Sequence, residues 1–400
     1  FSHCSSNLRG VLIMAQRDAT AAGTAAEDRF QKARTFERFT MAHPRLMHVK
    51  DRLLSAIRGA APGSLVLVLG PTGVGKTTLR MKCEQVLTAD MMADLQADPG
   101  RFPFVSVEAV ASLTGSFNWR DHFSRMLRGM DEPLIADKLN GQRIGGERSP
   151  TGRFTPGPRA AGFELQHAVE QALGHRRPAA VFVDEAQHLG RIASGRKLSD
   201  QLDVIKSIAN RTQTIHVLFG TYDLLAFRNL SGQLSRRCID VHFSRYRADD
   251  KDDLETFKNV LRTFQGQLPI PSFDLAQAWD FLYERSLGCV GILKEWLLRA
   301  LTTALADGKT TLTRTHLKQS ALSASQCEKI LAETKEGEMR LDEAEGSCSR
   351  LRLLLGLDAT RPDEPPERQR VDAIPMTKRR RAGQRSPKRD KVGATVAACG

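Results

Sequence analysis

The feature that most constrains this chain is residues 64–78, where an apolar run breaks into a glycine-rich loop that ends in Lys-Thr. This spacing matches the phosphate-loop pattern, in which backbone N–H groups at a helix N-terminus meet a polyphosphate. The glycines remove the Cβ atoms that would block this approach, the lysine reaches the β- and γ-phosphates, and the hydroxyl completes a Mg²⁺ shell. The residues predicted to bind ATP and Mg²⁺ here are Gly70, Pro71, Thr72, Gly73, Val74, Gly75, Lys76, Thr77 and Thr78.

The context of this loop separates it from an ordinary glycine turn, which is the alternative interpretation. Residues 65–69 before it are strand-like, and residues 79–87 after it have helical spacing. A strand before the loop and a helix after it are what the phosphate-loop motif requires, so the context favours nucleotide binding.

Composition and charge limit the class of protein. The chain has 400 residues with a formal net charge of +13, and no apolar stretch approaches the roughly 18 residues of a membrane span. The seven cysteines are scattered, which indicates a reducing compartment and no structural zinc. Residues 378–391 hold eight Lys or Arg against one Asp, so a basic tail adds to a mildly basic body. This pattern favours a nucleic-acid partner, although the tail could instead dock a protein, direct nuclear import or only aid solubility.

The order of apolar runs predicts an α/β domain over residues 43–246. Helical patterns separate five strand-like runs, and this alternation predicts a five-stranded parallel sheet covered by helices on both faces. The predicted strands are residues 64–69, 103–108, 179–183, 214–219 and 238–243. Proline and glycine interrupt the alternation over 131–160, which is predicted to be a flexible insertion.

Different patterns flank this domain. Residues 1–42 are predicted to be an N-terminal extension with an exposed amphipathic helix at 26–39, and translation is expected to begin at Met14. Residues 247–330 are predicted to form a small all-α domain, and residues 331–400 a largely disordered basic tail with a leucine-rich turn at 351–357. The predicted helices of the all-α domain are 250–265, 273–286, 290–306 and 313–326.

A pair of carboxylates ends the third predicted strand. Asp184 would orient Mg²⁺ together with Thr77, and Glu185 would polarise the attacking water. Adjacent carboxylates at a strand end can also cap a helix. The complete phosphate loop elsewhere in the chain favours the catalytic interpretation.

Three further positions are candidates for catalysis or nucleotide binding. Thr221 ends the fourth strand and could contact the γ-phosphate, although a β-branched residue is ordinary at a strand end. Arg236 and Arg237 could reach the γ-phosphate of a neighbouring subunit, or could be a solvated surface pair. Lys294 could bring a cation over the nucleotide from the all-α domain.

The assembly of motifs resembles AAA+ ATPases and, more narrowly, the TniB/TnsC family of transposition regulators, over about residues 43–326. The motifs for the broader resemblance are GPTGVGKTT at 70–78, VFVDE at 181–185, Thr221, Arg236 with Arg237, and GILK at 291–294. The segments for the narrower one are GSFNWRDHFSRML at 115–127, DEAQHL at 184–189, HVLFGTYDLL at 216–225 and QLSRRCIDVHFSRY at 233–246. The 131–160 stretch departs from the family pattern, and Lys294 stands where many AAA+ proteins have arginine.

The resemblance implies an AAA+ P-loop NTPase fold with an α-helical lid, and a bacterial, cytoplasmic, DNA-associated ATPase. Such a protein oligomerises on duplex DNA as a helix or ring in its ATP form, links a target-selector protein to a transposase, and disassembles after hydrolysis. Arg120, Arg125 and Arg128 follow the second strand on a predicted helix, and we expect them to face DNA phosphates.

Two other functions stay open at this point. One is a nucleotide-gated scaffold or signalling switch that hardly hydrolyses ATP, and the other is an AAA+ DNA loader such as a helicase loader or replication initiator. The lack of an obvious winged-helix or helix-turn-helix pattern after residue 330 disfavours an initiator. No transposase-type metal triad is evident in the sequence.

Overall fold

A computed structural model of the chain describes residues 31–111, 115–133, 135, 146–148, 154–156, 158–190, 198–228, 238–342 and 350–357. The chain divides into two compact units, Phe1–Glu343 and Ala344–Gly400. In the second unit, residues 350–354 are helical, and the leucines of the described stretch are exposed. Within these described ranges, no helix has both the length and the apolar character needed to cross a bilayer.

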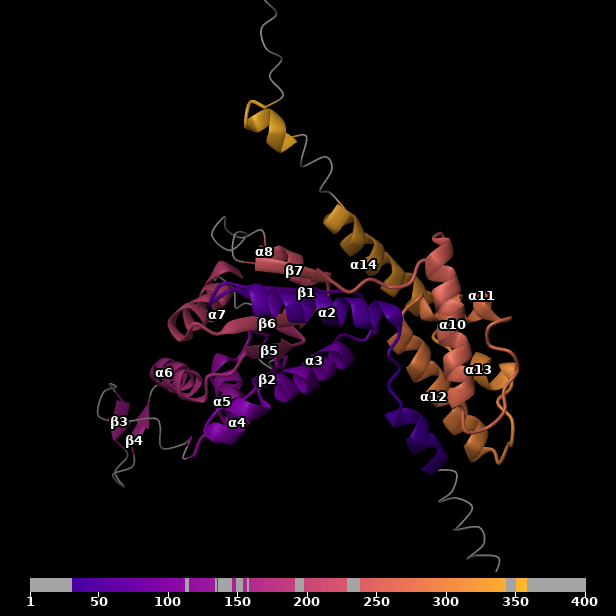
Figure 1. Cartoon of the computed structure of the whole chain (residues 1–400), viewed down its shortest axis with the longest axis horizontal. Helices are drawn as coiled ribbons and strands as arrows, with labels where there is room; N and C mark the ends of the chain where they lie inside the picture. The colour runs from indigo at the N-terminus through magenta and orange to yellow at the C-terminus, as the bar shows by residue number, and fades with distance from the viewer. Residues whose placement is uncertain are drawn as a thin grey trace, which may run out of the picture. The chain divides into compact units, whose positions relative to one another are not determined.

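The first unit contains the predicted parallel sheet, whose strand order is β2-β5-β6-β1-β7 (Figure 1). Every pairing in this sheet is parallel. The strands are β1 Leu65–Leu69, β2 Phe104–Glu108, β5 Ala180–Asp184, β6 Ile215–Gly220 and β7 Cys238–His242. The predicted fold class is confirmed, because all five apolar runs enter one sheet with their carboxyl ends at the same edge.

Helices bury both faces of this sheet, which explains why its central strands are continuously apolar. In β1, Leu65, Leu67 and Leu69 join one hydrophobic cluster, while Val66 and Val68 join the cluster on the opposite face. Side chains that alternate along a strand point to opposite faces, so each face needs its own covering layer.

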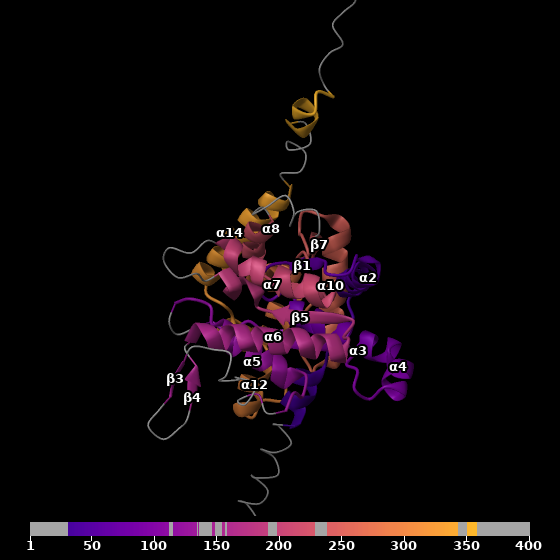
Figure 2. The ribbon, with the colours of Figure 1, turned by 90° about the vertical axis from the view of Figure 1, so that its left-hand side faces the viewer.

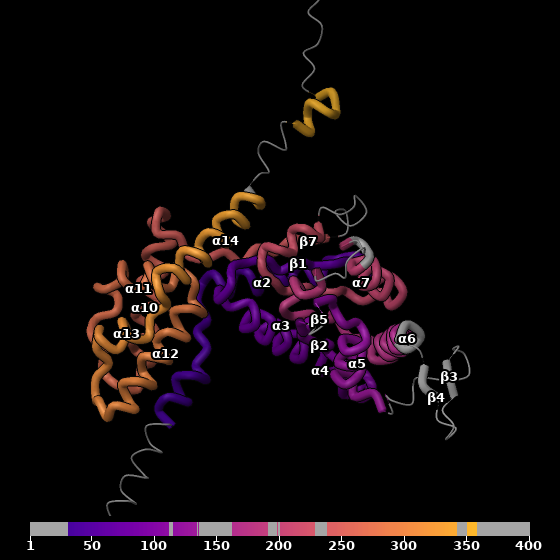
Figure 3. The backbone as a smooth tube through the Cα atoms, turned by 180° about the vertical axis from the view of Figure 1, so that it is seen from behind, coloured from indigo at the N-terminus to yellow at the C-terminus, as the bar shows by residue number. Residues whose placement is uncertain are grey.

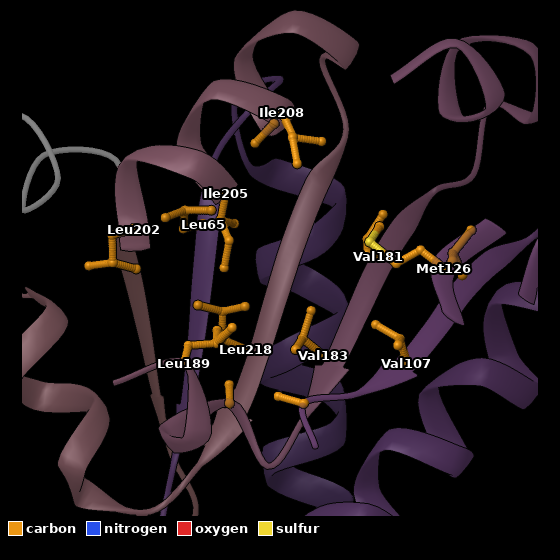
Figure 4. Close-up of a cluster of buried hydrophobic side chains, with 14 of the residues drawn as sticks. Leu65, Val107, Met126, Val181, Val183, Leu189, Leu202, Ile205, Ile208 and Leu218 are labelled. Carbon is orange, nitrogen blue, oxygen red and sulfur yellow. The ribbon is translucent and has the colours of Figure 1, made fainter. Parts of the chain in front are cut away.

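The two covering layers differ in their helices. The first cluster, shown in Figure 4, is covered by α5 Trp119–Gly129, α6 Pro158–Arg176 and α7 Leu198–Thr212. Figure 2 shows α6 and α7 in front of β5. The opposite face is covered by α2 Pro44–Gly59 and α3 Lys76–Asp90. Apolar side chains from five helices therefore fix the sheet from both sides.

Three short elements in this domain were not predicted. A helix, α4 Met92–Ala97, follows α3, and an antiparallel pair, β3 Gly146–Arg148 and β4 Phe154–Pro156, lies within the predicted flexible insertion. Most other residues of the 131–160 insertion lie outside the described residues.

The all-α domain forms around a cluster that includes the fully buried Trp296, whose Nε1 donates to Leu317 O over 2.8 Å. Its helices are α10 Lys251–Gln267, α11 Trp279–Ser286, α12 Val290–Ala306 and α13 Arg314–Ser320. The prediction that a helix begins at residue 273 was wrong. Asp274 Oδ1 accepts from the backbone N–H groups of Ala276 and Gln277, and this turn delays the start of α11.

A further helix, α14 Ala324–Asp342, corrects two predictions. The predicted helix 313–326 is interrupted because Ser323 Oγ accepts from Gln326 N and Gln326 Oε1 accepts from Ser323 N, which is a capping box that starts a new helix. The domain boundary placed at residue 330 lies inside α14. Residues 331–342 are therefore helical and not part of a disordered tail.

The predicted amphipathic N-terminal helix is present in the described part and most of its residues are exposed, but one of its faces is buried. Residues 31–38 are helical, and Phe36 is only 1% exposed. Its ring centroid lies 6.1 Å from that of Phe264 in α10, so this segment belongs to the core of the all-α domain. Figure 3 shows the indigo N-terminal segment beside that bundle.

Candidate nucleotide-binding site

The phosphate loop connects β1 to α3 and has the backbone that its glycines permit. Gly73 and Gly75 have φ values of 73° and 113°, which is the left-handed region that side chains disfavour. Gly75 precedes α3 and offers no side chain to its first N–H groups, so these donors face the loop. This arrangement is suited to an anion at the helix N-terminus.

Lys76 is buried in this loop, with 9% of its surface exposed. Its Nζ donates to Gly70 O over 3.0 Å and to Pro71 O over 2.9 Å. Burial lowers the pKa of Lys76 below its usual value, whereas the nearby Glu185 carboxylate acts in the opposite direction. An ammonium held by two carbonyls at a helix N-terminus that has no side-chain cap fits a site for phosphate oxygens.

Asp184, at the end of β5, is 7% exposed and has both carboxylate oxygens engaged. Oδ1 accepts from Glu185 N over 3.0 Å, and Oδ2 accepts from Arg80 Nε over 3.1 Å. Arg80 comes from α3 and also donates to Ser106 Oγ of β2 over 2.6 Å. This ion pair links the helix that follows the phosphate loop to the strand that carries the carboxylates.

The donor set near the loop is suited to Mg²⁺ only in combination with phosphate oxygens. Proteins usually hold Mg²⁺ through one or two carboxylates together with substrate phosphates and water. Thr77 and Asp184 provide such a set at the same edge of the sheet. No cluster of three or more His, Cys, Asp or Glu side chains suited to a metal occurs among the residues described.

Glu185 and Thr221 lie at adjacent strand ends, and Gln187 connects them. Gln187 lies in the 3₁₀ turn η1 Ala186–Gly190, and its Nε2 donates to Glu185 Oε2. Its Oε1 accepts from Thr221 N over 3.3 Å. The Thr221 hydroxyl donates to Asp223 Oδ2 over 3.2 Å.

A cavity of about 230 Å³ lies beside the phosphate loop. It is lined by the phosphate loop, by Thr221 with the 3₁₀ turn η2 Tyr222–Leu224, and by α14. Its lining residues are Pro71, Thr72, Thr221, Tyr222, Asp223, Ile330, Glu333 and Thr334. Helix α14, whose residues 331–342 were predicted to belong to a mostly disordered tail, therefore lies at the mouth of the phosphate loop.

A smaller pocket of about 50 Å³ lies between the loop, the N-terminal segment and α12. Gly75, Thr78, His43 and Lys294 are among its lining residues. Lys294 is thus beside the loop as expected, but its Nζ donates to Glu37 O over 2.8 Å. Its predicted role over a nucleotide stays a prediction.

The predicted arginines have different outcomes. Arg120, Arg125 and Arg128 all lie exposed on α5, and Arg125 pairs with Asp121 at 2.6 Å. Arg236 and Arg237 lie outside the described residues.

Sequence reasoning missed two residues of this site. Arg80 had a usable signal, because Lys76, Arg80 and Glu84 are four residues apart and share one helix face. Gln187 had no such signal, since a glutamine three residues after the end of β5 resembles any surface residue until the neighbouring strand end is placed beside it.

The fold is that of an AAA+ P-loop NTPase. It is defined by the strand order β2-β5-β6-β1-β7 with parallel pairing, by the phosphate loop after β1, and by the carboxylates at the same edge of the sheet. Residues 60–227 match the family described as AAA domain (AAA_22). The AAA domain expected from the sequence is confirmed over that range, whereas the narrower TniB/TnsC resemblance stays a prediction.

Solved structures include several that are similar to this chain. The Aeropyrum pernix ORC2 protein in its ADPNP-ADP complexes has 15% identity and a TM-score of 0.47, with 72% of each chain covered. A Walker-type ATPase of Pyrococcus abyssi has 18% identity and a TM-score of 0.41, over 78% of this chain and 81% of that one. The Aeropyrum pernix ORC1 protein in complex with DNA has 18% identity and a TM-score of 0.45, over 69% and 63%. No curated protein sequence matches the chain.

Proposed function

We propose that this protein is a magnesium-dependent ATPase that assembles on duplex DNA in its ATP form and regulates transposition. Its assembly would link a target-selector protein to a transposase in the bacterial cytoplasm. The observation that carries the ATPase proposal is that the phosphate loop, the Asp184–Glu185 pair and Thr221 all lie at the ends of neighbouring parallel strands at one sheet edge. The narrower role rests on the resemblance of the segments between the motifs to TniB and TnsC.

The residues of the site would divide the work. A triphosphate would replace the Gly70 and Pro71 carbonyls as the partner of Lys76 Nζ. Thr77 and Asp184 would hold Mg²⁺, which neutralises charge on the phosphates. Glu185 would accept the proton of the attacking water, and the Thr221 hydroxyl would contact the γ-phosphate.

The proposed assembly depends on a second copy of the chain. Arg236 or Arg237 of one subunit would reach the γ-phosphate bound by Lys76 of the next, where a guanidinium stabilises transition-state charge. The γ-phosphate would then hold two copies together, and its loss on hydrolysis would release them.

Electron microscopy of the full chain with duplex DNA tests the proposal. We expect regular assemblies with a nonhydrolysable ATP analogue and Mg²⁺, and none with ADP. The Glu185→Gln variant should form persistent assemblies with ATP itself, because it binds the nucleotide but cannot activate water. Glu255→Gln, on the exposed face of α10, is the matched control and should behave as the unaltered protein.

Two results would count against this function. A chain that stays monomeric with ATP, Mg²⁺ and DNA would refute the assembly. A Glu185→Gln variant that behaves as the unaltered protein in both turnover and assembly would favour a nucleotide-gated scaffold.

The DNA interaction of α5 is tested through its salt dependence. Replacing Arg120, Arg125 and Arg128 with Ala should reduce the slope of log affinity against log salt by about 0.9 for each DNA phosphate that is no longer neutralised. The control removes the same charge from exposed positions of the all-α domain, by replacing Arg262, Arg299 and Lys309 with Ala. Fluorescence anisotropy with labelled duplex DNA gives both slopes, and equal slopes for the two variants would exclude the α5 surface.

A further inference from the structure

Gln187 is the side chain that joins the two catalytic strand ends, and the direction of its amide is fixed by chemistry. A carboxylate such as that of Glu185 accepts hydrogen bonds, and the Thr221 N–H can only donate one. Nε2 must therefore face Glu185 Oε2, and Oε1 must face Thr221 N, 3.3 Å away. The reversed amide would lose both hydrogen bonds.

The end of β6 is shaped to receive this amide. A Cβ atom on Gly220 would lie 2.6 Å from Gln187 Oε1 and 2.8 Å from Leu224 Cδ1. Distances below 3.0 Å essentially never occur for real Cβ atoms, so a side chain at Gly220 would displace the amide. Glycine at this position lets the Gln187 amide lie directly against the strand end.

Glu185 lies just outside β5 in an unusual backbone conformation, so its carboxylate needs a hydrogen-bond partner to fix its orientation. Glu185 has a φ of 51°, in the left-handed region that non-glycine residues seldom adopt. The strand ends at Asp184, and the chain turns at Glu185 into η1, where His188 N donates to Glu185 O over 3.0 Å. A carboxylate on such a turn is oriented by its hydrogen-bond partner, because no strand pairing holds its residue.

We propose that Gln187 is a positioning residue that holds the Glu185 carboxylate toward the attacking water and ties this orientation to the end of β6. The inference rests on the proposed ATPase function and assigns a new residue to that site. Because the same amide accepts from Thr221 N, a shift of Thr221 on phosphate contact would reach the Glu185 carboxylate through one side chain.

Two substitutions separate the two hydrogen bonds. Gln187→Ala removes both of them. Gln187→Glu keeps the size of the side chain and the acceptor for Thr221 N, but it removes the donor and places a like charge beside Glu185. Both variants should lower kcat by about 10- to 100-fold, which is the usual effect of removing a group that orients a reacting residue. Affinity for a nonhydrolysable ATP analogue should be unchanged, since Glu185 acts on water and not on the bound phosphates.

A double-mutant cycle distinguishes positioning from a structural role. In the Glu185→Gln background, Gln187→Ala should cause no further loss of residual turnover, because the group that it orients is already inactive. Gln166→Ala is the matched control, since Gln166 Nε2 likewise donates to a glutamate, Glu170, but on α6. It should retain kcat, and the thermal unfolding midpoints of all variants should be compared.

The outcomes are distinct. Equal losses of kcat from Gln187→Ala in both backgrounds, or unaltered kcat in Gln187→Ala, would overturn the positioning role while leaving the ATPase function in place. Absence of turnover by the unaltered protein with DNA and Mg²⁺ would instead refute the proposed function, and this inference with it. A nucleotide affinity that falls together with kcat would indicate a structural role.

Discussion

Burial sets the protonation of single histidines in this protein. His216 of β6 is 2% exposed, and burial lowers its pKa to about 4, although a hydrogen bond to Thr214 O opposes this shift. Burial likewise lowers the pKa values of His43 and His122 to about 4. Between pH 6.5 and about 4 the unfolded chain binds protons at these rings that the folded protein does not, so stability is lost as the pH falls through this range.

Replacing His216 with Leu should make the protein less sensitive to acid. The loss of unfolding free energy between pH 7 and pH 5 should be smaller by about 1–2 kcal/mol, because one proton-binding ring has been removed from the unfolded chain. Urea unfolding at the two pH values measures this difference. His48→Leu, at an exposed position of α2, is the control. An unchanged pH dependence in His216→Leu would show that this ring does not contribute.

At the scale of elements, the N-terminus of α12 lies directly on the phosphate loop. Ile292 N donates to Gly73 O over 3.1 Å, and a Cβ atom on Gly291 would lie 2.4 Å from that oxygen. The all-α domain therefore contacts the phosphate loop through backbone atoms. Only glycine at residue 291 lets the α12 backbone come this close to Gly73 O.

Gly291→Ala should move α12 away from the loop and weaken ATP binding. Loss of the Ile292 hydrogen bond should weaken the free energy of ATP binding by about 0.5–1.5 kcal/mol, or roughly 2- to 13-fold in affinity. Displacement of the α12 backbone should weaken binding further. Isothermal titration calorimetry with a nonhydrolysable ATP analogue measures the change. Gly266→Ala in α10, where a Cβ atom meets nothing within 4 Å, is the control. Equal affinities of the two variants would argue against coupling between α12 and the loop.

The second element that reaches the site is α14. Arg245, beside β7, forms two hydrogen bonds of 3.1 and 3.2 Å with the Glu338 carboxylate of this helix. Gly337 lies so close to Tyr222 that a Cβ atom there would be 2.1 Å from Cγ of the ring. These contacts place α14 against η2, next to Thr221, so the helix lines the cavity at the phosphate loop.

For the whole molecule, the proposed active site is completed only by two copies. Lys76 would act on the nucleotide of its own subunit, whereas Arg236 or Arg237 would act on that of a neighbour. Defects in these two sets of residues would therefore lie on opposite sides of one interface.

Mixing two inactive variants tests this arrangement. Lys76→Ala and the Arg236→Ala/Arg237→Ala double variant should each lack ATPase activity, and the mixture should regain a part of it. Interfaces that pair Lys76 of one variant with the intact arginines of the other would be functional. Steady-state phosphate release with DNA present gives the measurement, and a mixture of Lys76→Ala with Glu185→Gln is the control without complementation. Failure of the first mixture would exclude arginines acting between subunits.

Local spacing was enough to predict the sheet, the phosphate loop and the pair of carboxylates at the end of β5. An apolar run, a glycine turn and a helical period depend only on residues that are close in the sequence, so they can be recognised without knowing the tertiary contacts. The capping box at Ser323 is likewise a local feature of the sequence, and the helix that it starts runs past residue 330 into a charged stretch.

Contacts between distant segments decided the remainder. The burial of Phe36, the ion pair of Arg80 with Asp184, the path of α14 and the link of Gln187 to Thr221 each join residues through space. Such contacts depend on which strand ends lie side by side and which helix crosses them. The spacing of apolar residues determines on which face of a helix or strand a side chain lies. Which residue it contacts on that face is determined only by how the elements pack in the tertiary structure.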